Sequence, residues 1–119
     1  MQDTKGFMWF GTKDGLNKFD GNSCKVFRYN PQKEKTIGNN IIHCMIEADN
    51  NKLYVGTEAG LYIMDIADET FEKVENTTAD NFKITYTVTT IFKDNRGNIW
   101  IGTNSQGIYT YNPEKNELK

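Results

Sequence analysis

The sequence has few cysteines, prolines and histidines, and it has no long apolar run. Two cysteines, Cys24 and Cys44, cannot form a disulfide scaffold or complete a zinc site. No apolar run approaches the ~20 residues that cross a bilayer, and no signal-peptide pattern opens the chain. There is no basic surplus, because 14 lysines and arginines face 16 acidic residues, for a net charge of −2. The sequence therefore predicts neither direct membrane contact nor nucleic-acid binding.

The 119 residues have a globular composition, with 37% hydrophobic, 25% charged and 13% aromatic residues. This length corresponds to one domain at most and allows one modest core. The high aromatic content favours β-rich packing over a helical bundle.

An internal repeat organises the chain. Each copy has an aromatic residue, one further residue and a Gly-Thr pair, followed by a glycine and an aliphatic residue. The aromatic residues are Trp9, Tyr54 and Trp100, and the Gly-Thr pairs begin at Gly11, Gly56 and Gly102. The pairs are 45 and 46 residues apart. A period of about 45 residues is typical of propeller blades that have four strands each.

The repeat predicts an all-β fold: a β-propeller fragment of about two and a half four-stranded antiparallel blades. We expect strands at 41–47, 53–57, 61–65, 71–74, 88–93, 99–103 and 108–112, where β-branched and aromatic residues gather. Residues 1–36 form a first blade that lacks its inner strand, and 37–82 form a complete middle blade. Residues 83–119 form a third blade that lacks its outer strand.

The turns between inner and second strands have a backbone requirement. Asp3 and Asp94 open two of them, where a carboxylate can accept hydrogen bonds from the backbone of its own turn. The last turn position needs a positive φ, which suits the glycines there. The middle copy has Ala48 and Asn51 at these two positions, so it loses one turn-stabilising group and keeps a tolerant residue type.

Two and a half blades leave apolar faces and strand edges uncovered. A closed propeller has about 4 to 8 blades. We therefore expect the missing surface to come from the remaining blades of a longer protein, or from other copies of this chain.

The pattern Asp-x-x-Gly-x-x-Trp-x-Gly-Thr, then Gly-Leu and an aromatic residue, resembles the two-component regulator propeller repeat. One copy is carried by Asp3, Gly6, Trp9, Gly11, Thr12, Gly15, Leu16, Phe19 and Asp20. A second is carried by Asp94, Gly97, Trp100, Gly102, Thr103, Gly107, Tyr111 and Asn112. The run from Phe7 to Gly21 is similar to the first blade of extracytoplasmic sensors in hybrid two-component histidine kinases of Bacteroides-type bacteria.

This resemblance implies a periplasmic propeller segment whose parent protein is anchored in the inner membrane. It implies recognition of oligosaccharides and regulation of transcription through a kinase region that this chain does not contain. It implies no catalysis in this segment, no catalytic residue and no cofactor. Two alternatives stay open: a propeller scaffold that binds proteins, and a propeller lyase or hydrolase fragment, which would need a catalytic cluster such as Asp14 with Glu58.

The ligand-binding candidates lie in the second-to-third-strand loops and in the segments between blades, on one face of the propeller. They are Lys13, Asp14, Asn39, Asn40, Glu58, Tyr86, Asn104 and Gln106. Amides, carboxylates and an aromatic ring suit the directional hydrogen bonds of sugar hydroxyls.

Other conspicuous residues have structural interpretations. The lone His43 has no partner cluster for a metal, so no metal site is expected. The two cysteines are expected to be free thiols, and the two tryptophans to pack between blades. The threonines of the Gly-Thr pairs are expected to satisfy local backbone groups, since no base lies beside them.

Overall fold

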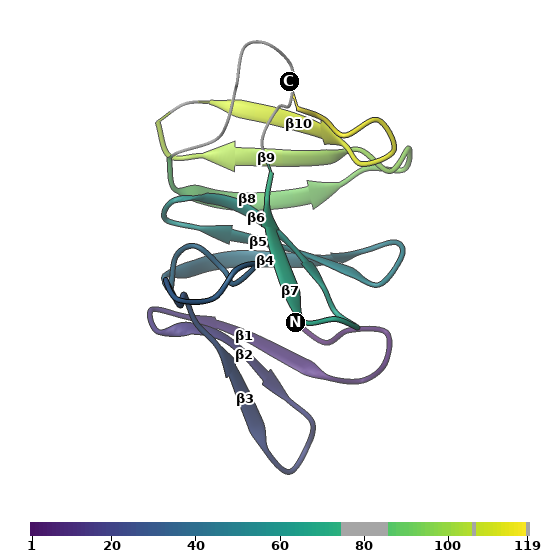
Figure 1. The fold of residues 1–119 in the computed structure, drawn as a ribbon. Coiled ribbons are helices and arrows are strands. Elements are labelled where there is room, and N and C mark those ends of the chain that lie inside the picture. The colour runs from purple at the N-terminus through teal and green to yellow at the C-terminus, as the bar shows by residue number, and fades with distance from the viewer. Residues whose placement is uncertain (75–85, 106, 119) are drawn as a thin grey trace.

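The computed structural model describes residues 1–74, 86–105 and 107–118, and in these ranges the protein is all-β. Three antiparallel sheets follow one another along the chain and stack face to face (Figure 1). The first sheet contains β1 (Met8–Thr12), β2 (Gly15–Phe19) and β3 (Cys24–Phe27). The second contains β4 (Ile42–Ala48), β5 (Lys52–Thr57), β6 (Gly60–Asp65) and β7 (Thr70–Lys73). The third contains β8 (Val88–Lys93), β9 (Ile99–Thr103), β10 (Ile108–Asn112) and β11 (Glu117–Leu118). No helix capable of crossing a bilayer occurs in this part of the chain.

The strand order matches the expected blades, with one correction. The first sheet has three strands, and only the pairing of Gln2 with Met8 stands where an inner strand would begin. The third sheet was expected to lack its outer strand, but β11 pairs with β10. A tight turn after Asn112, whose side chain accepts hydrogen bonds from two turn amides, lets the strand start at 117 and buries Leu118. The expected boundary between 82 and 83 lies outside the described residues.

Two hydrophobic clusters hold the sheets together. One lies between the first and second sheets, where Trp9 meets Leu53 and Val55. The other lies between the second and third sheets, where Tyr54 meets Ile99 and residues around it. Because alternate residues of β5 point to opposite faces, the middle sheet is buried on both sides.

The glycines of the first two Gly-Thr pairs allow neighbouring sheets to approach closely. A Cβ on Gly56 would lie 2.5 Å from Cys44 Sγ and 2.7 Å from Val88 Cγ1. A Cβ on Gly11 would lie 2.6 Å from Ile42 Cγ2 of the second sheet. Any side chain here would therefore push neighbouring strands apart.

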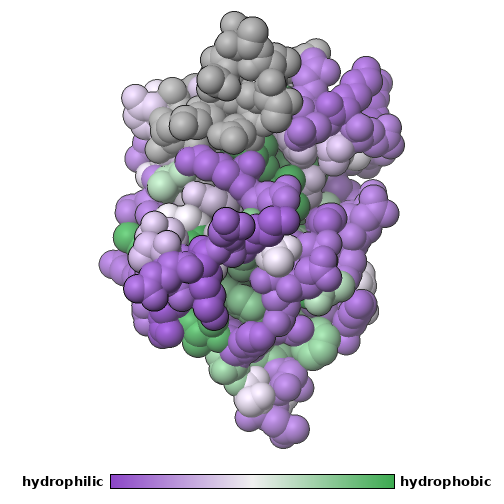
Figure 2. Space-filling model, viewed as in Figure 1, coloured by the Kyte–Doolittle hydropathy of each residue, from purple (hydrophilic) through white to green (hydrophobic). Residues whose placement is uncertain are grey.

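The outer faces of the first and third sheets carry exposed apolar residues. Phe10 is 48% exposed on the first sheet, and Trp100 is 43% and Ile108 72% exposed on the third. Trp9 packs against the second sheet and Tyr54 packs against the third. Among the described residues, no further sheet covers Trp100 in the same way. The face shown in Figure 2 is largely hydrophilic, with hydrophobic residues visible between the polar ones.

Candidate functional site

The loop face is the end of the sheets formed by turns 13–14, 58–59 and 104–105 and by the connecting segments 39–41 and 86–87. Backbone hydrogen bonds join these parts into one surface. Gly15 N donates to Asn40 O over 2.7 Å, and Glu58 N donates to Ile41 O over 3.1 Å. Asn104 N donates to Thr87 O over 3.2 Å. The sequence-predicted loops therefore do come together, in the order of the sheets.

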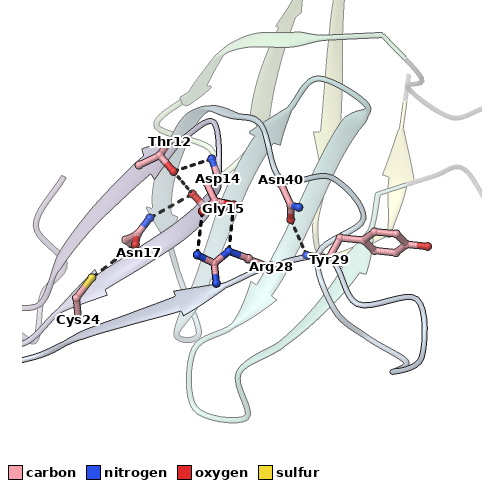
Figure 3. Close-up of polar contacts among 8 residues, drawn as sticks. All are labelled: Thr12, Asp14, Gly15, Asn17, Cys24, Arg28, Tyr29 and Asn40. Atoms are coloured by element: carbon pink, nitrogen blue, oxygen red, sulfur yellow. Dashed lines mark hydrogen bonds and ion pairs between the residues drawn. The ribbon is translucent and has the colours of Figure 1, made fainter.

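Several predicted binding residues of the loop face are engaged in structural contacts. Arg28 binds both carboxylate oxygens of Asp14, at 3.1 and 2.9 Å (Figure 3). These hydrogen bonds, with the charge of Arg28, hold the pKa of Asp14 below its ordinary value. The side-chain oxygen of Asn40 accepts from Tyr29 N at 2.6 Å, and that of Asn39 accepts from Ile41 N at 2.9 Å.

The remaining candidates are exposed or make longer contacts. Lys13 and Tyr86 are exposed on the loop face. Glu58 Oε1 lies 3.8 Å from His43 Nε2, and His43 stands where the register of β4 against β5 shifts. Such bulges re-aim a side chain, here toward the loop face. Gln106 lies outside the described residues.

The threonines and cysteines have the structural roles expected for them. Thr57 Oγ1 donates to Gly60 O at 2.9 Å and accepts from Ala59 N at 3.0 Å, and Thr12 makes the equivalent bonds. Cys24 and Cys44 are free thiols, and burial raises the pKa of Cys44 to about 11. Among the described residues, no group of three or more histidine, cysteine or carboxylate side chains is placed to hold a metal ion.

A bond between the turn and the second strand was missed by sequence reasoning. Asp3 accepts hydrogen bonds from the turn amides of Lys5 and Phe7, as expected, and its other oxygen accepts from Trp9 Nε1 at 2.8 Å. Asp94 repeats the arrangement with Trp100 Nε1 at 2.9 Å. The signal was present in the sequence, because the copy that lacks this aspartate also lacks the tryptophan.

A second concave region lies at the opposite ends of the strands and was not foreseen. We call it the turn groove; it has a volume of about 650 Å³ and lies between the second and third sheets. Tyr54 and Tyr111 line it, with ring centroids 6.2 Å apart. Turns 49–51 and 95–97 bound one side, and the β6–β7 and β10–β11 turns bound the other.

Ion pairs surround the turn groove. Lys52 Nζ lies 2.9 Å from Asp65 Oδ2, and this hydrogen bond lowers the pKa of Asp65. Lys93 Nζ lies 3.3 Å from Asp49 Oδ1 across the two sheets. Burial raises the pKa of Tyr54 well above its ordinary value, so its hydroxyl keeps its proton.

Comparison with known proteins finds similar repeats and domains. Residues 84–105 match the model of the two component regulator propeller. The chain contains a two-component regulator propeller repeat. A 36-residue segment, 30% of the chain, is 53% identical to histidine kinase P4 of Formosa agariphila and covers 3% of that protein.

Solved structures extend the likeness of this propeller repeat to the whole chain. The extracellular domain of BT3049 from B. thetaiotaomicron, described as a hybrid two component system, matches 100% of the chain with a TM-score of 0.87 and 25% identity. That of BT4673, described as a one component system, matches 95% with a TM-score of 0.75 and 23% identity, which supports the fold alone. The fragment spans 17% and 15% of those two chains. The β-propeller fold expected from the repeat is confirmed.

Proposed function

We propose that this chain is a ligand-recognition segment of an extracytoplasmic sensor propeller in a hybrid two-component system, and that its ligands are oligosaccharides. The observation that carries the proposal is the match of the whole chain to the extracellular domain of such a system. The segment itself is not catalytic, and the kinase chemistry belongs to another part of the parent protein. The parent places the propeller in the periplasm, is anchored in the inner membrane, and regulates transcription.

The chemistry of the loop face supports a sugar ligand. It presents the exposed side chains of Glu58, Asn104 and Tyr86, which supply a carboxylate, an amide and an aromatic ring. Sugar recognition needs many directional hydrogen bonds and an apolar ring face. A lyase or hydrolase built on Asp14 and Glu58 is less well supported, because Arg28 occupies both carboxylate oxygens of Asp14.

Further blades, or copies of this chain, are the partners we propose for the outer sheet faces. Trp100 is 43% exposed, whereas Trp9, its counterpart, is 1% exposed against the second sheet. A face that exposes Trp100 and Ile108 together would be covered by one more sheet of the same kind. This observation also favours the second candidate function, a scaffold whose apolar faces bind protein.

Isothermal titration calorimetry of the complete extracellular region tests the sensor function. The panel would contain cellotriose, xylotriose, maltotriose and a chondroitin disaccharide, with a reporter gene downstream of the parent kinase as the second readout. We expect one glycan both to release heat and to change transcription. Neither binding nor a transcriptional response to any glycan would refute the proposal and leave the scaffold function in its place.

A further inference from the structure

Two side chains at one wall of the turn groove are smaller in the second sheet than their counterparts in the neighbouring sheets. Between the first and second sheets, the equivalent space holds the hydrogen-bonded pair of Asp3, 6% exposed, and Trp9, 1% exposed. The second sheet has Ala48 and Tyr54 at these positions. These smaller side chains leave more room at one wall of the groove, whose volume of about 650 Å³ lies within the roughly 300–1,000 Å³ of ligand sites.

The hydroxyl of Tyr54 is the feature that indicates a ligand site in the turn groove. The residue is 2% exposed. Among the described residues its oxygen has no hydrogen-bond partner, whereas Tyr111 Oη donates to Asn116 Oδ1 at 2.7 Å. No side-chain nitrogen or oxygen of the described residues is fully buried without a partner, so the Tyr54 oxygen reaches the open space of the groove. A buried phenol that faces a hollow is a hydrogen-bonding group available to a guest molecule.

The charges around the turn groove favour a neutral guest. Four cationic and five anionic side chains line it. Three lysines are paired with three of the acids, in the pairs Lys52–Asp65, Lys93–Asp49 and Lys35–Glu72. The side chains of Arg96, Asp68 and Glu114 have no ion-pair partner within the described part of the chain. Donors and acceptors are thus mixed without a strong net charge, which suits hydroxyl groups better than an ion.

The walls of the turn groove also offer an apolar surface for a sugar ring. Tyr54 and Tyr111 lie with an interplanar angle of 56°, and Ile63 and Ile99 continue the apolar lining. Aromatic side chains present an apolar face together with a polar tip, the combination that a pyranose ring and its hydroxyls need.

We infer that the turn groove is a binding site for a short neutral saccharide, with the Tyr54 hydroxyl and the Arg96 guanidinium as hydrogen-bonding groups. This inference rests on the proposed function, and it places the ligand at the opposite end of the sheets from the loop-face residues. The guest lies between two sheets, so its binding also couples the second sheet to the third.

A matched pair of Tyr→Phe variants tests the site. Tyr54→Phe removes one hydroxyl from the turn groove, and Tyr29→Phe removes one from an exposed residue that does not line it. NMR titrations of the full chain with cellobiose, maltose, xylobiose and mannobiose would give each Kd, with thermal melting to confirm that both variants fold. We expect Tyr54→Phe to weaken binding about 2- to 10-fold, the equivalent of one hydrogen bond, and Tyr29→Phe to leave it unchanged. Arg96→Ala provides a second groove variant on the exposed rim.

Each outcome decides the question. Weaker binding only in the groove variants supports the site. Unchanged Kd in Tyr54→Phe and Arg96→Ala, with or without a loss in Tyr29→Phe, overturns the groove assignment and leaves the sensor function standing. Absence of binding by every disaccharide in the wild-type chain overturns the groove assignment and counts against oligosaccharide recognition by this segment as well.

Discussion

Replacing the turn aspartates tests the two Asp–Trp bonds against each other. Asp3 and Asp94 accept the same set of hydrogen bonds, two from turn amides and one from the indole N–H of Trp9 or Trp100. Their surroundings differ, since Trp9 is 1% and Trp100 43% exposed. The substitutions Asp3→Ala and Asp94→Ala therefore remove equal numbers of bonds at a buried and an open site.

We expect the substitution at the buried site, Asp3→Ala, to destabilise the protein more than Asp94→Ala. Without the Asp3 carboxylate, the Trp9 N–H stays buried with no acceptor, and the two turn amides lose theirs. A buried unsatisfied donor costs about 1–3 kcal/mol, and bonds to a charged group contribute about as much, so we expect Asp3→Ala to lower the free energy of unfolding by about 2–4 kcal/mol. At Asp94 water can replace the carboxylate on both the indole and the amides, so the loss is smaller.

Asp3→Asn separates the turn bonds from the indole bond. The amide oxygen of asparagine can still accept from the amides of Lys5 and Phe7, but its NH₂ group then faces the Trp9 N–H, donor against donor. We expect this variant to lie between wild type and Asp3→Ala.

Urea unfolding followed by far-UV circular dichroism measures these differences without depending on tryptophan emission. Equal m-values among the variants are required for the comparison, since m reports the surface exposed on unfolding. Equal losses for Asp3→Ala and Asp94→Ala, or no loss for Asp3→Ala, would refute the argument that burial of the indole decides the strength of this bond.

Four further predictions follow from packing, burial and exposure. Gly56→Ala should lower the free energy of unfolding by about 1–3 kcal/mol, because its Cβ would overlap Cys44 and Val88; urea unfolding measures it, and an unchanged midpoint would contradict the close approach. Iodoacetamide should modify native Cys24 and spare Cys44, as peptide mass spectrometry would show. Since burial raises the pKa of Cys44 from 9.0 to about 11, its contribution to stability is present below pH 9 and is lost as the pH rises through about 11, and Cys44→Ala should flatten this part of the stability curve. Acrylamide should quench the fluorescence of Trp100 and spare that of the buried Trp9. Equal quenching of the two would show that the outer sheet face is covered.

The fold was predictable because each copy of the repeat contains the residues that mark its own strands and turns. Strands expected at 88–93, 99–103 and 108–112 have these bounds in the structure. The positive φ expected at the last turn position is found at Gly6 (92°), Gly97 (83°) and Asn51 (61°). Each of these features depends on a few neighbouring residues, so local sequence was sufficient.

Other features were not predicted from the pattern of the repeat. Asp3 was assigned to its turn alone, although the joint absence of the aspartate and the tryptophan from the middle copy carried the signal of their bond. The second positive φ in the middle turn, at Asn50 (63°), has no counterpart in the other two copies. The turn groove is lined by residues of both the second and the third sheet, and such a volume becomes visible only when both sheets are in place.

Polar pairs at the turns suggest how the order of the sheets is specified. Thr4, one residue after the turn aspartate position of the first sheet, donates two hydrogen bonds to the carboxylate of Glu47, at the end of the inner strand of the second. At the same two positions one sheet further on, Asp49 meets Lys93. Neither partner could be exchanged with its counterpart, because Asp49 beside Glu47 would bring two carboxylates together. Asn95 holds this position on the third sheet, and a sheet that stacks there must offer a hydrogen-bonding side chain opposite it.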